Sequence, residues 1–403
     1  MKTSRPFALS IVAADLVLMA TLLVPGGAGA AGDTTPPTVP KNLHVTSASP
    51  TQVSLAWDAS TDNVGVTAYI VLRDGIKIDR VKAPKTSYTD RSVAADKTYR
   101  YRVRARDAAG NRSQVSRRVV ASTATSVVVA AAGDIACDPS DPNYHGGTGT
   151  STACRQRYTS DLLVNGDYDA VLALGDLQYD SGSLSDFNAV NDPTWGRVKS
   201  ITYPVVGNHE YGQSGASGYF DYFGSRAGPR GKGYYSFNLA SWHIVAINSN
   251  CGEVSCSANS PQEQWLRADL AAHPTECTIA MWHHARWSSG HDGDNTFMQT
   301  MWGDLEDAGV EILLSGHSHD YERFAPQDEN GSVDNANGVR QFVVGTGGAF
   351  FTGLGTDFDA NSQVHQNTTY GILKLTLRPT AYDWRFVPEA GKTFTDSGTT
   401  ACH

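Results

Sequence analysis

Five short apolar runs punctuate the second part of the chain, and each ends in a polar motif. The runs are rich in β-branched and aliphatic residues, as expected of strands that are buried on both faces of a sheet. Ligand-binding groups in such sheets gather beyond the carboxyl ends of the strands. The pattern therefore predicts buried strands with their chemistry at one end. The runs are Val127–Ala132, Ala170–Leu174, Ile201–Val206, Thr278–Trp282 and Val310–Leu314.

Two helices and a second group of strands are expected in the same region. The Ser-Pro-Gln-Glu segment 260–263 is a capping box with proline at the first helical position, so it opens a helix. Segment 295–308 repeats Phe297, Met301 and Leu305 at helical spacing. We interpret both helices as core elements and assign the later apolar runs to a second sheet. These later runs are Gln341–Val344, Ile372–Leu377 and Trp384–Val387.

The front part of the chain alternates apolar and polar residues in short segments. Turn signals separate the segments, among them Asp74-Gly75, which predicts a hairpin turn. In segment 99–105 arginine occupies every second position, as on the wet face of a sandwich. With Trp57 in an early strand and Tyr99 placed like a tyrosine corner, the stretch resembles a bacterial fibronectin type III domain. The resemblance implies an N-terminal all-β sandwich over residues 37–122, of a kind that spaces or attaches an enzyme.

Residues 1–31 have the features of a cleaved signal peptide. Lys2 and Arg5 provide a positive start, an apolar stretch follows to Val24, and Ala28-Gly29-Ala30 is a small-residue cleavage site. Asp15 is unfavourable for insertion, and a retained membrane anchor is the alternative. We therefore expect a secreted, extracellular protein that has no membrane contact after cleavage.

All six cysteines follow this segment, and an even number in an exported chain indicates disulfides. Six cysteines allow fifteen connectivities, and the sequence alone does not choose among them. Closeness along the chain favours two short bridges and leaves a long one for the C-terminus. The favoured pairs are Cys137–Cys154, Cys251–Cys256 and Cys277–Cys402.

Charge is distributed unevenly along the chain. Residues 33–125 contain 15 Lys+Arg and 8 Asp+Glu, a net charge of +7, whereas residues 126–403 contain 15 and 32, a net charge of −17. An acidic region does not hold nucleic acid by its general field, so we expect no nucleic-acid partner. For the basic front domain we weigh contact with cell-wall polyanions, or with the acidic domain behind it, against the simpler alternative of a solvated basic surface.

The polar motifs after the five apolar runs have the residue types of a two-metal site. Carboxylate, amide and imidazole groups are all metal ligands. Two imidazoles two positions apart can serve two sites from one turn. Each motif is weak alone, because a single histidine is commonly a core residue. The motifs are Gly133-Asp134, Gly175-Asp176-Leu177-Gln178-Tyr179, Gly207-Asn208-His209-Glu210, Trp282-His283-His284 and Gly316-His317-Ser318-His319.

In this order the motifs resemble those of the calcineurin-like metallophosphoesterases, and Tyr179 narrows the resemblance to the purple acid phosphatase branch. The resemblance covers residues 126–403 and implies a four-layer αββα sandwich of the α/β class. Ala136 stands where other branches have a histidine, and Tyr179 is the substitute that the phosphatase branch uses.

The resemblance also assigns a role to each motif residue. Phenolate is a hard ligand suited to a trivalent ion. A metal-bound hydroxide would attack a small phosphate monoester. The assignments are Asp134, Tyr179 and His319 for iron(III), Asn208, His283 and His317 for a divalent ion (iron, zinc or manganese), and Asp176 as the bridge.

Four further residues lie close to the ligand motifs. His209 and His291 are candidates for the general acid and for phosphate contact, against the alternatives of a structural neighbour and a loop histidine. His284 should point away from His283, since neighbouring residues of a strand face opposite sides, so that it supports the ligands or contacts substrate. Arg323 either reaches substrate or forms a salt bridge.

Three functions are compatible with these motifs. A phosphomonoesterase is the leading hypothesis, and a phosphodiesterase or nucleotidase would keep every ligand. A non-catalytic secreted adhesion or scaffold protein should have lost at least one ligand, whereas every motif residue is present, which favours catalysis. The sequence has neither G-x-S-x-G nor G-x-x-x-x-G-K, so serine-hydrolase and P-loop mechanisms are excluded.

Overall fold

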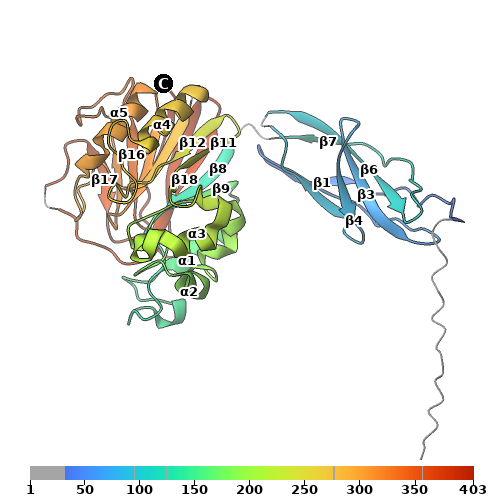
Figure 1. Ribbon diagram of the computed structural model, residues 1–403, viewed down its shortest axis with the longest axis horizontal. Coiled ribbons are helices and arrows are strands. Elements are labelled where there is room, and N and C mark those ends of the chain that lie inside the picture. Colours follow the sequence, from blue (N-terminus) through green and yellow to red (C-terminus); the bar gives the residue numbers. More distant parts are fainter. Residues whose placement is uncertain (1–31, 95, 124–125, 276, 356) are drawn as a thin grey trace, which may run out of the picture.

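The computed structural model describes residues 32–94, 96–123, 126–275, 277–355 and 357–403. The expected signal peptide, residues 1–31, lies outside the described residues. The chain forms an N-terminal β-sandwich followed by a larger domain of sheets and helices (Figure 1). Within the described ranges, none of the helices combines the length and apolar character that crossing a membrane requires.

Seven strands form the N-terminal β-sandwich, in sheets of order β1-β2-β5 and β4-β3-β6-β7. Val103 and Ala105 of β6 are buried between the sheets, whereas Arg102 is exposed, as the alternation predicts. The Tyr99 hydroxyl accepts a hydrogen bond from the backbone N–H of Ala94 at 2.8 Å, which is the contact of a tyrosine corner. The all-β prediction is confirmed. The strands are β1 His44–Ala48, β2 Val53–Ala56, β3 Val66–Arg73, β4 Ile76–Lys82, β5 Ser87–Asp90, β6 Thr98–Asp107 and β7 Val119–Ser122.

Two mixed sheets stack face to face in the larger domain. Their strand orders are β10-β9-β8-β18-β19-β20 and β11-β12-β13-β14-β16-β15-β17. Leu172 of β9 and Leu314 of β14 belong to one buried core, so the two sheets share their interior. The strands are β8 Val127–Ala132, β9 Ala170–Leu174, β10 Thr202–Val205, β11 Tyr235–Leu239, β12 Trp242–Ala246, β13 Thr278–His284, β14 Ile312–Gly316, β15 Tyr321–Phe324, β16 Arg340–Val344, β17 Ser362–Gln366, β18 Gly371–Arg378, β19 Ala381–Pro388 and β20 Ser397–Ala401.

Helices lie outside both sheets, so the expected four-layer arrangement is confirmed. Leu266 of α4 and Trp302 of α5 form a second core with Leu313 of β14. Helix α1 contacts β18 on the other side. In Figure 1 α4 and α5 lie together, apart from the group of α1, α2 and α3. The helices are α1 Gln156–Asn165, α2 Leu184–Asp186, α3 Ser217–Phe223, α4 Pro261–Ala272 and α5 Gln299–Asp307.

The later apolar runs do not form a sheet of their own, so that part of the prediction is wrong. Strand β16 pairs in parallel with β14, whereas β18 pairs antiparallel with β8. Each sheet therefore combines early and late strands. An apolar run identifies a buried strand, but any buried strand can be its partner, so the pattern alone does not determine the pairing.

Both predicted helices form, with one change in the second. The Ser260 Oγ accepts a hydrogen bond from the Glu263 backbone N–H at 3.2 Å, and α4 begins at the next residue, Pro261. In the second segment α5 begins only at Gln299, after the 3₁₀ turn Thr296–Met298. Phe297 is consequently 46% exposed, and its assignment to the core is wrong.

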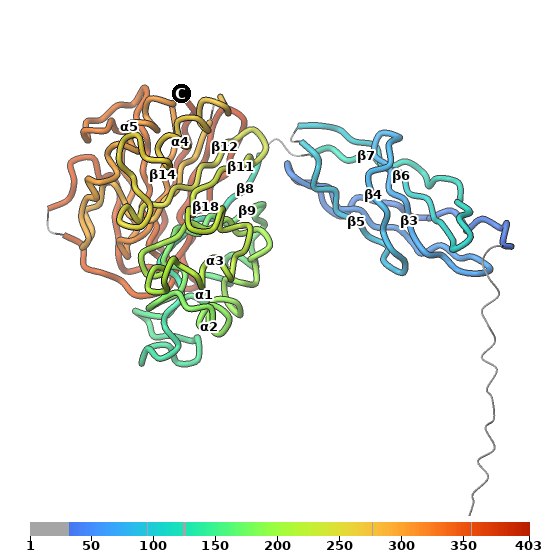
Figure 2. Tube along the Cα trace, in the orientation of Figure 1, coloured from blue at the N-terminus to red at the C-terminus, as the bar shows by residue number. Residues whose placement is uncertain are grey.

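The three disulfides are the expected pairs, two short bridges and one long one. They join Cys137 to Cys154, Cys251 to Cys256 and Cys277 to Cys402. The last pair spans 125 residues and fastens the segment after β20 to the residue before β13. Figure 2 shows the course of the chain, from the N-terminal sandwich in blue to the C-terminal segment in red.

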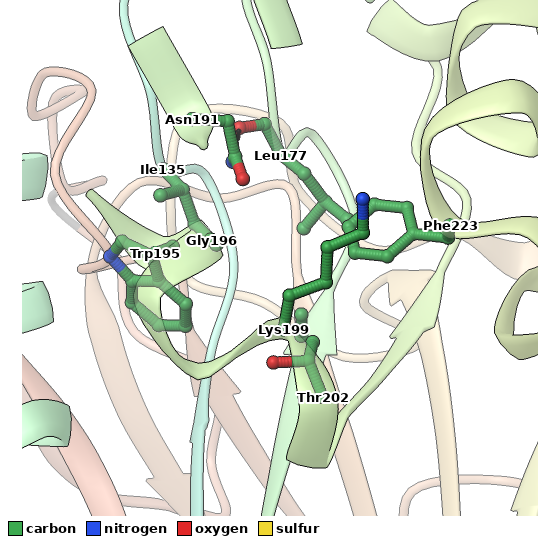
Figure 3. Close-up of a pocket in the computed structure, with 9 residues that line it drawn as sticks. Ile135, Leu177, Asn191, Trp195, Gly196, Lys199, Thr202 and Phe223 are labelled. Carbon is green, nitrogen blue, oxygen red and sulfur yellow. Dashed lines mark hydrogen bonds between the residues drawn. The ribbon is translucent and has the colours of Figure 1, made fainter. Parts of the chain in front are cut away.

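A small cavity lies between the loops that follow β8 and β9 and the segment before β10 (Figure 3). Its volume is about 10 Å³, and its lining includes Ile135, Leu177, Trp195 and Phe223. This is close to the space of a single water-sized sphere. The cavity is therefore a packing void beneath the loops and is too small to hold a substrate.

Candidate metal centre

The five motifs converge although their strands belong to two sheets. Asp134 follows β8, Asp176 follows β9, and Asn208 lies just beyond β10 in the same sheet. His283 is the penultimate residue of β13, and His317 follows β14 in the facing sheet. Because the two sheets stack with these strand ends on one side, their polar side chains meet at a single edge.

Glycine at the head of a motif makes room for the carboxylate of a neighbouring motif. A Cβ atom on Gly207 would overlap Oδ1 of Asp176, and one on Gly316 would lie 2.6 Å from Oδ2 of Asp134. Asp134 and Asp176 themselves have left-handed φ angles of 58° and 50°. Such conformations are costly for residues with a side chain and recur at functional sites. The strained backbone at Asp134 and Asp176 thus allows their carboxylates to pack close to the glycines of neighbouring motifs.

Tyr179 is the centre of the first group of donor atoms. Its hydroxyl oxygen lies 3.0 Å from Oδ1 of Asp134, 3.1 Å from Oδ2 of Asp176 and 2.8 Å from Nε2 of His319. The other two residues of the first expected set, Asp134 and His319, are also close to each other, with His319 Nε2 3.3 Å from Asp134 Oδ1. His319 Nδ1 is hydrogen-bonded to the carbonyl oxygen of Phe350 at 2.6 Å, so Nδ1 carries the proton and Nε2 faces the group.

His283 is the centre of the second group. Its Nε2 lies 3.1 Å from Oδ1 of Asn208 and 3.2 Å from Oδ2 of Asp176. His283 Nδ1 donates to the carbonyl oxygen of Leu174 at 2.8 Å, which again directs Nε2 into the site. Donor atoms of Asp176, His283 and His317 all lie within 4.8 Å of one another.

The donor set fits two metal ions that share one carboxylate. Oδ2 of Asp176 belongs to both groups, since it approaches Tyr179 on one side and His283 on the other. Carboxylate, phenol, amide and imidazole groups together suit iron, zinc and manganese. All seven residues expected to bind metal are thus brought together in the structure.

Burial and the two aspartates shift the proton affinities of the cluster. Burial, and then the carboxylates of Asp134 and Asp176, raise the pKa of Tyr179 well above its usual range. Burial alone would lower the pKa of His283, but Asp176 raises it to about 10. A cation that binds these groups must displace a proton from each, so metal affinity should weaken as the pH falls.

Glu210 is a positioning residue that our sequence reasoning missed. Its buried carboxylate accepts hydrogen bonds from four backbone N–H groups, at 3.1 Å from Asp176, 2.8 Å from Leu177, 3.3 Å from Gln178 and 2.7 Å from Gly207. The loop after β9 and the loop after β10 are therefore fastened to one side chain. Its place at the end of the Gly-Asn-His-Glu motif was the only signal in the sequence.

His284 does not point away from His283, so the expectation from strand alternation is wrong. The register of β13 against β14 shifts between Met281 and His284, which inserts one extra residue into β13. The His284 ring consequently lies 4.4 Å from the ring of His317. His284 Nδ1 is hydrogen-bonded to Oγ of Ser249 at 2.8 Å, and no sequence motif predicted this contact.

The two candidate acids occupy different surroundings. His209 is partly exposed, its Nδ1 is 2.6 Å from the carbonyl oxygen of Asp180, and its ring lies 4.3 Å from that of Tyr179. Its Nε2 lies 3.9 Å from Oδ2 of Asp176, so His209 is at the edge of the donor cluster. His291 is exposed in the loop after Gly290, which packs against Ser318 and Asp320 beside the last motif.

Arg323 lies outside the cluster. Its Nε donates to Oδ2 of Asp396 at 2.7 Å, and Nη2 donates to Oδ1 at 3.2 Å, while Nη1 is hydrogen-bonded to Gln363. The geometry favours the salt-bridge alternative for Arg323. Its neighbour Glu322 instead accepts hydrogen bonds from the backbone N–H and the hydroxyl of Ser289, and so braces the loop that leads to His291.

Comparison with known proteins agrees with this geometry. The family model described as calcineurin-like phosphoesterase matches residues 129–321, and the model described as fibronectin type III domain matches residues 36–122. Purple acid phosphatase 15 of Arabidopsis thaliana is 26% identical over 224 residues, which cover 46% of this chain and 41% of that protein. Purple acid phosphatase 22 of the same plant is 38% identical over 97 residues, covering 23% of this chain and 22% of that protein.

An alpha-amylase of Niallia circulans is 45% identical over 91 residues, covering 23% of this chain and 7% of that protein. The chain thus spans less than half of each of these curated relatives. Among solved structures, the purple acid phosphatase from yellow lupin seeds has a TM-score of 0.57 at 18% identity, covering 90% of this chain and 74% of that one. This likeness shows the shared fold.

Residues 129–321 thus form a calcineurin-like phosphoesterase domain, and a fibronectin type III domain precedes it. Within that family, its resemblance is to the purple acid phosphatases. This domain match and the donor cluster together imply a dinuclear metal site.

Proposed function

We propose that this protein is an exported phosphomonoesterase that uses iron(III) and a divalent ion of iron, zinc or manganese. The observation that carries the proposal is the complete donor set, in which Asp176 is shared between two groups. When bound, the two ions would supply an activated water and neutralise charge on the phosphate oxygens. Asp134, Tyr179 and His319 would hold the iron, Asn208, His283 and His317 the divalent ion, and Asp176 both.

The chain's own residues would position the ester and move a proton. With Nδ1 of His209 facing the carbonyl oxygen of Asp180, Nε2 is the nitrogen available to the phosphate or to the leaving oxygen. His291, exposed in its loop, is the second candidate for this proton transfer. His284, whose ring lies beside that of His317, is a candidate for substrate contact.

Export is part of the same proposal. Disulfides form and persist in oxidising compartments, and all six cysteines are paired. Residues 1–31 carry the expected cleavage signal. N-terminal sequencing of protein from the culture medium should therefore begin close to Ala31 or Gly32.

Kinetics on a panel of substrates test the proposed reaction. We expect kcat/KM for small phosphate monoesters to exceed that for diesters and nucleotides by at least about tenfold, a difference of about 1.4 kcal/mol in the transition state. A preference for diesters or nucleotides would contradict the monoesterase assignment and identify the protein as a phosphodiesterase or a nucleotidase. If a metal-loaded sample hydrolysed none of the esters, the chain would be a non-catalytic scaffold or adhesion protein.

A further inference from the structure

One face of the fibronectin type III domain carries two strands of basic residues on either side of an apolar strand. On β6, Arg102, Arg104 and Arg106 alternate with buried residues and point outward together. The middle strand β3 lies between β6 and β4, and its outward residues are opposite a cation on both sides. The three rows across the face are Lys77–Leu72–Arg102, Arg80–Ile70–Arg104 and Lys82–Ala68–Arg106.

The apolar residues in the middle of these rows are buried beneath the neighbouring side chains. Ala68 is 1% and Ile70 is 5% exposed, although both belong to the outward side of β3. Long basic side chains bury their aliphatic stems on such residues and keep the charged ends in water. The face therefore holds its charged groups above these apolar residues, and on β6 the charges are spaced about 6.8 Å apart.

The charges of this face are not neutralised within the domain. Among the described residues of the fibronectin domain, the ion pair within 4.0 Å is Arg73 with Asp90, and neither belongs to the rows. The Nε atoms of Arg104 and Arg106 are buried and have no hydrogen-bond partner.

The rows end in a hollow that gathers more arginines. Arg100, Arg102 and Arg118 line it together with Asp74 and Gly75. The Asp74 carboxylate accepts a hydrogen bond from the backbone N–H of Arg100 at 3.0 Å, so one of its oxygens is already engaged. Asp79 on β4 is the other acidic residue near the rows. Cations outnumber acidic groups on this face by eight to two, counting Lys77, Arg80, Lys82, Arg100, Arg102, Arg104, Arg106 and Arg118.

We infer that this basic face binds a linear polymer of phosphodiester-linked units that carries no aromatic bases. Evenly spaced cations match a chain with one charge per repeat, and guanidinium groups suit phosphate because their forked donors bind two oxygens. The outward residues of the rows are basic or aliphatic, so the face offers no aromatic platform on which bases could stack. The inference goes beyond the proposed activity and does not depend on it.

Binding of a labelled poly(glycerol phosphate) to the purified full-length chain tests this inference. Affinity should fall about 10- to 100-fold between 50 and 200 mM salt, because bound cations release counterions. The variant Arg102→Glu/Arg104→Glu should bind at least about tenfold more weakly at low salt. The control Lys41→Glu/Arg91→Glu makes the same change in net charge beside the β1-β2-β5 sheet and should bind within about twofold of wild type.

An unchanged thermal midpoint and far-UV circular dichroism spectrum would show that the first variant is folded. If it is not, Lys77→Gln/Arg80→Gln on exposed positions of β4 should show a smaller loss in the same direction. Equal binding by wild type and the face variants, or an equal loss in the control, would overturn the inference. Tighter binding of a single-stranded DNA or a polyuronate of equal charge would overturn the assignment to a base-free phosphate polymer.

Discussion

Tyr179 is the residue on which the identity of the metals depends. Its hydroxyl is within 3.1 Å of donor atoms from Asp134, Asp176 and His319, so it can share one ion with all three. A phenolate is a hard anionic ligand and favours a trivalent ion over zinc or manganese. The iron assignment therefore concerns a single side chain, whereas the phosphoesterase assignment rests on the whole set.

Replacing Tyr179 with phenylalanine separates these two assignments. If the phenolate binds iron(III), the wild-type protein should be violet from ligand-to-metal charge transfer, and Tyr179→Phe should lose this absorption band. Metal should still bind, with changed affinity, because the carboxylate, amide and imidazole donors remain. Visible spectra and metal analysis of both proteins provide the measurement. A colourless wild type that contains zinc or manganese would contradict the iron assignment alone.

At the residue scale, the sequence predicted the metal ligands better than the residues that hold the ligand loops in place. Asp134, Asp176 and His283 come at or one glycine beyond the end of an apolar run, so the strand pattern itself directs them to one edge. The role of Glu210 depends on which backbone N–H groups surround it, and two separate loops supply these. For Arg323 the sequence could not decide between substrate contact and a salt bridge, because its partner Asp396 lies 73 positions away.

At the element scale, the extra residue in β13 changes what the site presents. It brings His284 beside His317, and the exposed Phe297 ring lies 5.7 Å from the His284 ring. Strand periodicity could not predict this, since a bulge depends on the pairing with β14 and not on the residues of β13 alone. The loop after β16 adds a second aromatic ring, Phe350, 4.5 Å from the ring of His319.

Phe350 should contribute to the binding of esters with aromatic leaving groups. It is 41% exposed and stands beside Tyr179 and His319, where a leaving group could pack against it. Phe350→Ala should raise KM for an aryl phosphate about three- to tenfold, the equivalent of one aromatic contact, and leave glycerol phosphate unchanged. Steady-state kinetics with both esters provide the measurement. Phe358→Ala, which removes a similarly exposed ring stacked on His365, is the control and should change neither.

The packing of α4 against α5 leads to a prediction of pH dependence. Burial, and then Glu263 of α4, raise the pKa of Asp304 in α5 to about 6. Because this pKa lies above the value of 3.8 for a free aspartate, Asp304 contributes stability below about pH 4 and loses it as the pH rises through about 6. Asp304→Asn should therefore raise the thermal midpoint at pH 7 and have little effect at pH 4. A larger gain at pH 4 would reverse the sign and contradict the assignment.

At the scale of the whole molecule, the sequence predicted the layers but not the order of the strands. The turn at Asp74-Gly75 forms as expected, with φ angles of 49° and 87°, because the turn type is encoded locally. The mixing of early and late strands in both sheets depends on contacts between distant segments, such as β8 with β18. The same contacts between distant segments bring five strand ends together. They place the carboxylate of Asp176 between the two groups of donor atoms.

Metal content and activity measured on the same samples of wild type and Asp176→Ala test the central claim most directly. Loss of Asp176 removes the group shared by both ions and leaves two cations close together without it. We predict about two metal ions per chain in wild type and, in Asp176→Ala, loss of both metal and hydrolysis of 4-nitrophenyl phosphate by at least about a thousandfold. Asp221→Ala, at an exposed carboxylate paired with Arg230, should retain both. A wild-type protein without bound metal, or an Asp176→Ala variant that keeps its metals and its activity, would contradict the account.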